Sequence, residues 1–187
     1  CYFALKKYQE AFDTYQELNK TSFASPSTFF YAAKSRELLD DDSTVVLALL
    51  DSAIVRFPVP YTIDAAPYLL QRAQHRQKYG RFREAALDYD AYEKVVGTQN
   101  LNDNFFYMKE QAEVAANLFS WALNDIDKAL LIKPKEYLYM VEKAVIQLRV
   151  GNNDEAIYDA QQALKLNVDG ADAYKVLGIA NAQKNNK

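Results

Sequence analysis

One stretch near the end of the chain constrains the fold more than any other, because the sequence there repeats itself. Tyr137 to Gly170 reads as one helix, a tight turn at Gly151-Asn152-Asn153 and a second helix. From Ala171 the pattern begins again in the same phase, as ADAYKVLGIANAQ. Self-similarity at a fixed period of this length indicates stacked helical hairpins, each of which buries its apolar face only against its neighbours. We therefore expect a repeat protein.

The small, glycine and paired residues of these repeats resemble those of the tetratricopeptide repeat (TPR). Ala144 occupies the small position of the first helix, and Gly151 is the turn residue. The second helix opens with Glu155-Ala156-Ile157 and ends with the small–large pair Ala163-Leu164. In the following repeat, the aromatic, leucine and glycine positions of the family hold Tyr174, Leu177 and Gly178.

This resemblance covers nearly the whole chain, and it implies an all-α fold, a right-handed α-solenoid of antiparallel helix hairpins. We predict one TPR solenoid domain over residues 1–187. Because the chain starts and stops inside repeats, we also expect it to be a fragment of a longer protein. The predicted repeats are 1–20 (partial), 27–58, 66–97, 103–134, 137–170 and 171–187 (partial).

The expected turn positions recur at intervals of about 34 to 39 residues, against a family period of about 34. They are Lys6, Asp41, Gly80, Asn117, Gly151 and Asn185. The first helix of repeat 103–134 matches the family least, because Glu110 stands at the small position and Ala112 lies two residues later. We expect a local irregularity there, or a helix pair that packs slightly differently.

The composition excludes several classes of protein. The net charge is −3, whereas a general nucleic-acid binder has a basic footprint. No apolar run approaches the roughly 18 residues of a membrane span, and no signal-peptide pattern opens the chain. The single cysteine, Cys1, excludes an intrachain disulfide, and its register places it inside a helix rather than at a lipidation site.

No constellation of catalytic residues is present, so we expect no enzyme activity. The only histidine, His75, has no cysteine near it in the sequence and is interpreted as structural. A zinc site of several Cys and His is excluded by their number. The acidic run Asp40 to Ser43 lacks the ligand spacing of a calcium loop and is interpreted as a helix end followed by an N-cap. We therefore expect no metal and no cofactor.

Three pairs of opposite charge lie symmetrically about turn residues, at a spacing of sixteen. They are Arg72 with Asp88, Lys109 with Asp125, and Lys143 with Asp159. Residues equidistant from the turn of an antiparallel hairpin lie opposite each other, so we predict one ion pair within each repeat. The alternative is that the basic members point into the groove and meet an acidic ligand.

The resemblance also implies that the first helices of the repeats line a concave face that binds peptides. In the predicted register, two positions per helix project there. They hold Tyr31 and Ser35, Leu70 and Gln74, Tyr107 and Gln111, Val141 and Val145, and Lys175 and Ile179. The lysine, asparagine and arginine pattern with which some TPR co-chaperones clamp a terminal carboxylate is absent, so that specificity is not carried over.

We therefore predict a non-enzymatic scaffold that binds a peptide or helix of a partner protein in this groove. One alternative is the TPR portion of a larger sensor, transporter accessory or enzyme. Another is a structural module that self-associates through its terminal repeats. The tyrosine- and asparagine-rich, cysteine-poor composition is typical of bacterial proteins; we expect a soluble protein without membrane insertion, and favour the periplasmic side of the cell envelope over the cytoplasm.

Overall fold

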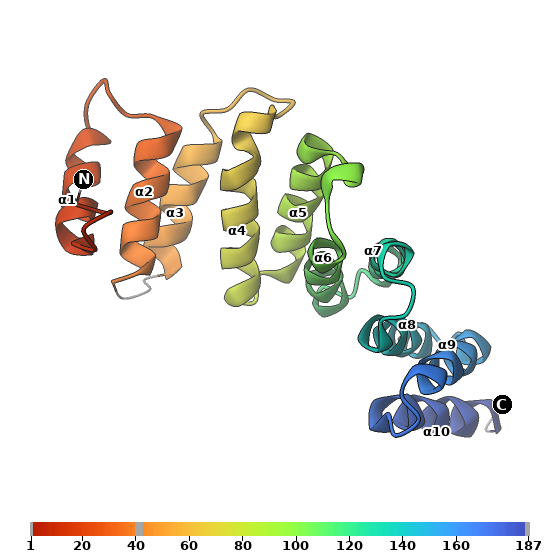
Figure 1. The fold of residues 1–187 in the computed structure, drawn as a ribbon. Helices are drawn as coiled ribbons and strands as arrows, with labels where there is room; N and C mark the ends of the chain where they lie inside the picture. The colour runs from red at the N-terminus through yellow and green to blue at the C-terminus, as the bar shows by residue number, and fades with distance from the viewer. Residues whose placement is uncertain (1, 40–42, 186–187) are drawn as a thin grey trace. The chain divides into compact units, whose positions relative to one another are not determined.

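The structure, a computed structural model, is built from α-helices that pack in consecutive pairs (Figure 1). It describes residues 2–39 and 43–185, and within these ranges it contains no β-strand. The predicted all-α class with helix hairpins is confirmed. The chain divides into two compact units, Cys1–Gln99 and Asn100–Lys187.

The first unit contains α1 and two complete hairpins, α2 with α3 and α4 with α5. Within this unit, α1 also packs on α2, and α3 on α4. Its elements are α1 (Tyr8–Leu18), α2 (Pro26–Glu37), α3 (Ser43–Ile54), η1 (Ile63–Ala65), α4 (Ala66–Lys78) and α5 (Phe82–Val96). The short helix η2 (Thr98–Asn100) follows where the chain passes to the second unit.

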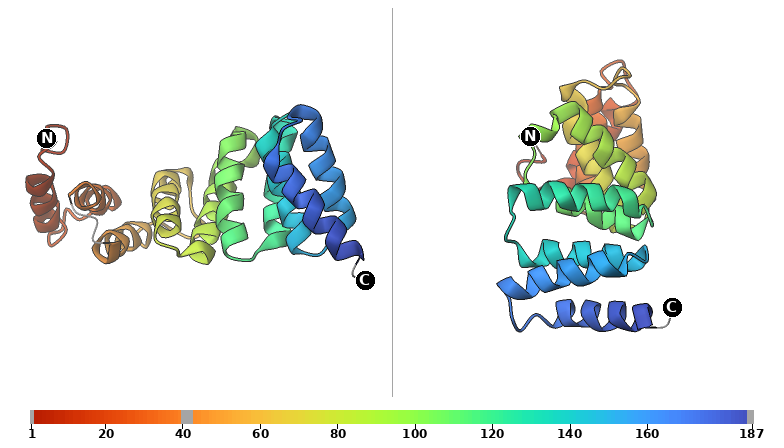
Figure 2. Two further views of the ribbon diagram at one scale, coloured as in Figure 1. Left: turned by 90° about the horizontal axis from the view of Figure 1, so that it is seen from below. Right: turned by 90° about the vertical axis from the view of Figure 1, so that its right-hand side faces the viewer.

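The second unit contains the hairpins α6 with α7 and α8 with α9, followed by α10, which packs on both α8 and α9. Figure 2 shows α9 and α10 side by side from two further directions. The helices are α6 (Asp103–Ala115), α7 (Phe119–Ile132), α8 (Tyr137–Arg149), α9 (Asn153–Leu166) and α10 (Ala171–Asn185).

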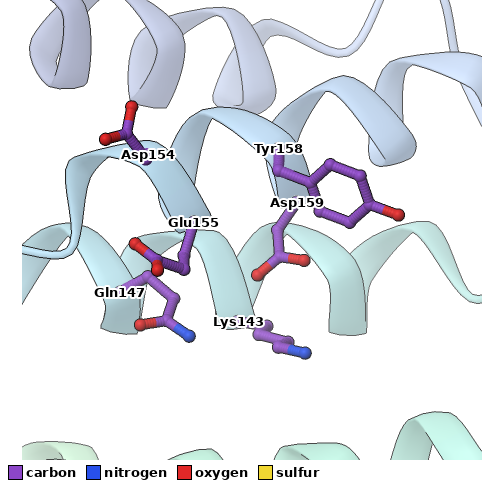
Figure 3. Close-up of a pocket in the computed structure, with 6 residues that line it drawn as sticks. All are labelled: Lys143, Gln147, Asp154, Glu155, Tyr158 and Asp159. Carbon is purple, nitrogen blue, oxygen red and sulfur yellow. The ribbon is translucent and has the colours of Figure 1, made fainter.

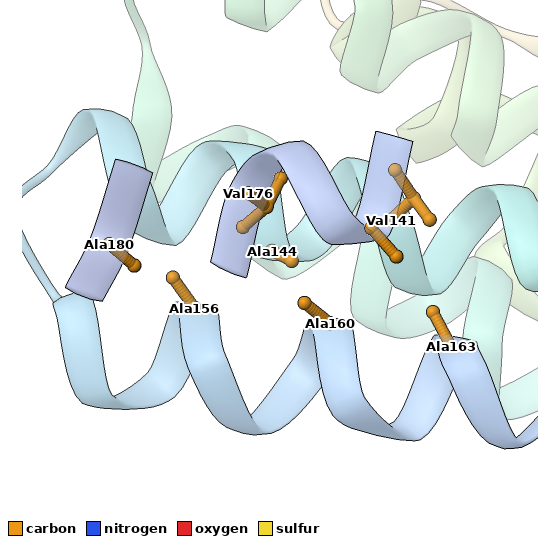
Figure 4. Packing of buried hydrophobic residues seen from close by; sticks show 8 residues of the cluster. Val141, Ala144, Ala156, Ala160, Ala163, Val176 and Ala180 are labelled. Atoms are coloured by element: carbon orange, nitrogen blue, oxygen red, sulfur yellow. The ribbon is translucent and has the colours of Figure 1, made fainter. Parts of the chain in front are cut away.

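Alanine spacing explains how three helices meet in the second unit. Ala156, Ala160 and Ala163 of α9 are fully buried and recur at helical spacing, so they form one small-residue face (Figure 4). That face packs with Ala144 of α8 and Val176 of α10. Because alanine side chains are short, the helix backbones can approach closely and the core needs no large side chain at these positions.

The turns follow the predicted positions where those positions are described. The backbone φ is +75° at Gly80 and +83° at Gly151, a left-handed conformation that glycine adopts without steric cost. Lys6 and Asn117 take the same conformation, with φ of 59° and 58°. The helix α10 ends at Asn185, the last predicted turn position, and residues 186–187 lie outside the described part of the chain.

The irregularity expected around Glu110 is not a break in the helix, because α6 runs without interruption from Asp103 to Ala115. Glu110 is instead completely buried in place of a small residue. Burial raises the pKa of its carboxyl to about 7, which favours the uncharged form. Protonation thus allows a regular helix to carry a glutamate at a core position. Cys1 and Asp40 to Asp42, to which the sequence assigned a helix position and a turn, lie outside the described residues.

Candidate partner-binding groove

A cavity of about 380 Å³ lies between the first helix of one repeat and that of the next, α8 and α10. Val141 and Val145 of α8, both predicted groove residues, line it, as do Lys175 and Ile179 of α10. In each pair the residues are one helical turn apart and therefore share a face. The rest of the apolar lining comes from Tyr137, Leu138, Leu148 and Val176.

The apolar lining is only partly covered by the protein itself. Leu138 on α8 is 41% exposed and Ile179 on α10 is 40% exposed, so each helix contributes an accessible apolar side chain. Val141, at 5% exposed, forms the floor and packs into the core of the second unit. A partner side chain that entered here would therefore contact apolar atoms from both helices.

Four charged residues complete the lining: Glu142, Arg149, Asp172 and Lys175. Burial raises the pKa of the half-buried Glu142 carboxyl, the charge of Arg149 lowers it, and that of Asp172 raises it further. Within the described parts of the chain, Glu142 forms neither an ion pair nor a hydrogen bond. Its charge is thus partly desolvated without a directly bonded counterion.

The neighbouring helix α6 places the predicted groove residues Tyr107 and Gln111 in contacts inside the protein. The Tyr107 ring packs against that of Tyr139, with 5.2 Å between ring centroids. Gln111 Nε2 donates a hydrogen bond of 2.7 Å to Glu110 Oε2. Both residues remain half-buried. Burial raises the pKa of Tyr107, and the charge of Glu142 raises it further, so this ring lies within electrostatic range of the groove carboxylate.

In the first unit the predicted groove residues do not share one surface. Ser35 is fully buried, and its Oγ donates a hydrogen bond of 2.7 Å to the carbonyl oxygen of Tyr31, so Ser35 cannot contact a partner. The buried Ala33 and Ser35 of α2 match the buried Ala73 and His75 of α4, whereas the predicted register aligned Ser35 with Gln74. The predicted register of this repeat was therefore wrong by one residue, which turns a side chain by about 100° around the helix.

The other three predicted groove residues of this unit have different surroundings. Tyr31 is 40% exposed and stacks on Tyr15, with 5.8 Å between ring centroids. Leu70 is half-buried, and Gln74 is exposed. Leu70 and Gln74 thus remain accessible on α4, whereas the Tyr31 ring belongs to an aromatic cluster.

The structure brings Arg72 and Asp88 together in a bidentate ion pair. Arg72 Nη2 lies 2.7 Å from Asp88 Oδ1, and Arg72 Nε donates to Oδ2 at 2.9 Å. Arg76 Nη1 lies 2.7 Å from the same carboxylate. Both arginines also reach Asp51 of α3, at 2.6 and 3.2 Å, which the sequence pattern did not predict. The pair within one repeat is thus part of a cluster that joins two repeats.

The remaining predicted pairs differ from each other. Lys109 Nζ lies 2.9 Å from Asp125 Oδ2, with both side chains buried. Lys143 instead pairs with Asp127 of α7 at 2.9 Å rather than with Asp159, although both aspartates are described. Asp127 precedes Lys143 by the same spacing of sixteen at which Asp159 follows it, so spacing could not distinguish them. Asp127 is 55% exposed, and pairing with it keeps the ammonium group close to water.

A second cavity of about 380 Å³ lies on the α8–α9 hairpin and has a polar lining (Figure 3). Lys143 and Gln147 come from α8, and Asp154, Glu155, Tyr158 and Asp159 come from α9. Burial raises the pKa of Asp159, which the nearby Lys143 counteracts. Among the described residues, no aliphatic side chain lines this cavity, so it lacks the apolar anchor that the α8–α10 groove offers.

His75 lies in the core of the first unit, where it is 2% exposed. Its Nε2 is 3.2 Å from the carbonyl oxygen of Ser43, and its Nδ1 is 3.5 Å from Glu37 Oε1. Among residues 2–39 and 43–185, no group of three His, Cys, Asp or Glu side chains is arranged to hold a metal ion. In the same ranges, no helix combines the length and the apolarity needed to cross a membrane.

Neither a protein-family model nor a curated protein matches the sequence. Solved structures do match. A MamA protein aligns over 86% of this chain and 82% of its own, with 13% identity and a TM-score of 0.67. YrrB, described as a TPR protein with an unusual peptide-binding site, aligns over 92% of this chain and 84% of its own, with 16% identity and a TM-score of 0.65.

A tetratricopeptide repeat protein from Parabacteroides merdae aligns over 86% of this chain and 60% of its own, with 15% identity and a TM-score of 0.65. At these identities the likeness concerns the fold. It agrees with the consecutive helix hairpins of this chain. The chain therefore has the fold of the tetratricopeptide repeat proteins.

Proposed function

We propose that this chain is a non-enzymatic protein-interaction scaffold, and that the groove between α8 and α10 binds a segment of a partner protein. The observation that carries the proposal is the cavity of about 380 Å³ with apolar walls from both helices and charged residues around them. Accessible apolar surface with a polar rim is typical of interaction sites.

The size of the groove suits a few side chains rather than a whole folded domain. Its volume is near the lower end of the range of about 300 to 1,000 Å³ found for ligand pockets. A helix or extended segment can place one or two apolar anchors in such a groove and leave its polar side chains at the rim. The solved structure of YrrB supports this use of the fold, since it is described as having a peptide-binding site.

We retain Val141, Val145 and Ile179 from the predicted groove and add Leu138 as a second accessible anchor beside Ile179. Ser35 is withdrawn because it is buried. Partner contacts remain proposals for Tyr31, Leu70, Gln74, Tyr107 and Gln111.

Selection from a phage-displayed library of random dodecapeptides tests the proposal. The immobilised chain is compared with the variants Leu138→Ser and Ile179→Ser, which each remove one accessible apolar wall. Leu131→Ser on α7 is the matched control, because Leu131 is 85% exposed and does not line the cavity. We expect peptides selected by the unmodified chain and by the control to lose binding to both groove variants.

Continued binding to the groove variants would contradict the proposed site. Selected peptides that bind the two groove variants as well as the unmodified chain would place the interaction surface elsewhere. Failure to select any peptide, combined with concentration-dependent light scattering, would favour the self-associating module over a peptide-binding scaffold.

A further inference from the structure

We propose that the α8–α10 groove selects partner segments that carry a lysine or arginine next to an apolar anchor, with Glu142 as the residue that receives the cation. This inference rests on the proposed peptide-binding function and names the chemistry of the partner. Three features of the groove favour this chemistry: a carboxylate that has no ion pair among the described residues, a second carboxylate in the same groove, and the short distance from Glu142 to the apolar wall.

The first feature is the state of Glu142 itself. Its side chain is half-buried, so it has lost part of its hydration, yet in the described residues no cation lies within ion-pair distance of it. A partly desolvated charge without a directly bonded partner is unfavourable. A cationic group brought by a ligand would restore the missing interaction, whereas a carboxylate brought by a ligand would be repelled.

The second feature is that another carboxylate, Asp172 of α10, lines the same groove. The charge of Asp172 raises the pKa of Glu142, so the two carboxylates lie within electrostatic range of each other. Glu110 of α6 is also near Glu142, but it is buried and favours its uncharged form, so it adds little negative charge. Glu142 and Asp172 thus place two carboxylates in one groove.

Two basic residues line the same groove, and their positions matter. Arg149 lies on α8 two helical turns beyond Glu142 and is exposed, and it lowers the pKa of Glu142 without forming an ion pair with it. Lys175 on α10 is exposed as well. Asp172 is also exposed, so water and salt screen the charges of all three residues, whereas the half-buried Glu142 is less screened. The local preference at Glu142 is therefore for a cation.

The third feature is the short distance between the acidic site and the apolar wall. Glu142 and Val145 are three residues apart on α8, so their Cβ atoms are about 5–6 Å apart on one face. Residues separated by one turn of a partner helix, or by two positions of an extended partner, have a similar spacing. One partner segment can therefore place an apolar side chain on Val145 and Ile179 while its lysine or arginine reaches Glu142.

The dodecapeptide selection described above also tests this chemistry, through the composition of the selected pool. We expect lysine or arginine to be enriched within four positions of an apolar residue. A fluorescein-labelled peptide synthesised from that pool then gives dissociation constants by anisotropy. Glu142→Gln keeps the shape of the side chain, and we expect it to weaken binding by roughly tenfold, as for loss of a charge-assisted hydrogen bond.

A matched control and a double-mutant cycle separate the contact from general effects. Glu155→Gln removes an exposed carboxylate on α9 outside the groove and should leave affinity unchanged. Replacing the basic residue of the peptide by glutamine should weaken binding to the unmodified chain but have little further effect on the Glu142→Gln variant. Circular dichroism verifies that both variants remain folded.

The outcomes distinguish this inference from the proposed function. If the pool is acidic, or if Glu142→Gln binds as tightly as the unmodified chain while Ile179→Ser does not, the basic preference is wrong and the groove remains the binding site. If Ile179→Ser also has no effect on binding, both proposals are wrong.

Discussion

The ring of Tyr137 lies against the backbone of Gly170 so closely that a Cβ atom at Gly170 would be 2.7 Å from both Cε2 and Cζ of the ring. Tyr137 begins α8 and also lines the proposed groove, and Gly170 is the last residue before α10. This contact therefore links the spacing of the two helices to the shape of the groove.

Gly170→Ala should destabilise the protein by about 1–3 kcal/mol, because the added methyl group must push the Tyr137 ring out of its place. Urea unfolding followed by circular dichroism measures the change. Gly178→Ala is the matched control: a Cβ there meets no atom within 4 Å, and alanine is the better helix former, so this variant should gain about 0.5–1 kcal/mol. Equal stabilities for the two variants would contradict the close contact.

Asp88→Asn should cost far more stability than Asp51→Asn, although both aspartates bind the same two arginines. The Asp88 side chain is 5% exposed and accepts from Arg72 and Arg76, so its loss leaves two guanidinium groups without their buried counterion. We expect a cost of about 3–5 kcal/mol for Asp88→Asn. The Asp51 side chain is 47% exposed, and solvent should limit its cost to about 1 kcal/mol or less.

The midpoints of thermal unfolding for the two aspartate variants provide the measurement. Similar losses for both would show that the buried and exposed carboxylates contribute equally, contrary to the burial argument. Raising the salt concentration should affect the Asp51 contribution more than that of Asp88, because exposed pairs are screened more strongly.

Stability should fall as the pH rises from about 4.5 to about 9, because two buried carboxyls resist ionisation. Burial, together with the charge of Asp125, raises the pKa of Glu113 to about 9. Burial also raises the pKa of Glu110 to about 7. Both values exceed the unfolded value of 4.5, so the folded state binds more protons in this window, and the stability present at low pH is lost as the carboxyls ionise.

Glu113→Gln should reduce this pH dependence, since a neutral amide replaces the carboxyl in the same space. We expect it to raise stability at pH 9 by about 1–3 kcal/mol relative to the unmodified chain, with little change at pH 5. The measurement is the free energy of urea unfolding at each pH. Glu155→Gln, at an exposed position, should leave the profile as it is. An unchanged profile for Glu113→Gln would contradict the assignment.

His75→Ala should destabilise the first unit by about 2–4 kcal/mol, as expected when a large buried side chain is removed. The ring lies against Tyr79, with 4.7 Å between centroids, and its Nε2 is within hydrogen-bond distance of Ser43 at the start of α3. Gln74→Ala, one position earlier on an exposed face, should change stability by no more than about 0.5 kcal/mol. Equal stability for these two variants would mean that His75 is not part of the core.

Local features of the sequence were enough to predict the hairpins. The glycines at 80 and 151 allow left-handed turns, and the spacing of Ala156, Ala160 and Ala163 places small side chains on one helix face. Each of these features depends on conformations within a few residues, or on the constant 3.6-residue period of the helix. A pattern read along the chain therefore contains the information that decides them.

The tertiary structure decided which side chains are available to a partner. Ser35 was predicted for the groove and is buried, Lys143 pairs with Asp127 instead of Asp159, and Glu142 emerged beside the predicted Val141. These outcomes depend on how each helix is rotated against its neighbours, and a shift of one residue turns a side chain by about 100°. The sequence by itself determined the repeated hairpin, because its rules are local, whereas burial, ion-pair choice and the groove required the packing of helices that are distant in the sequence.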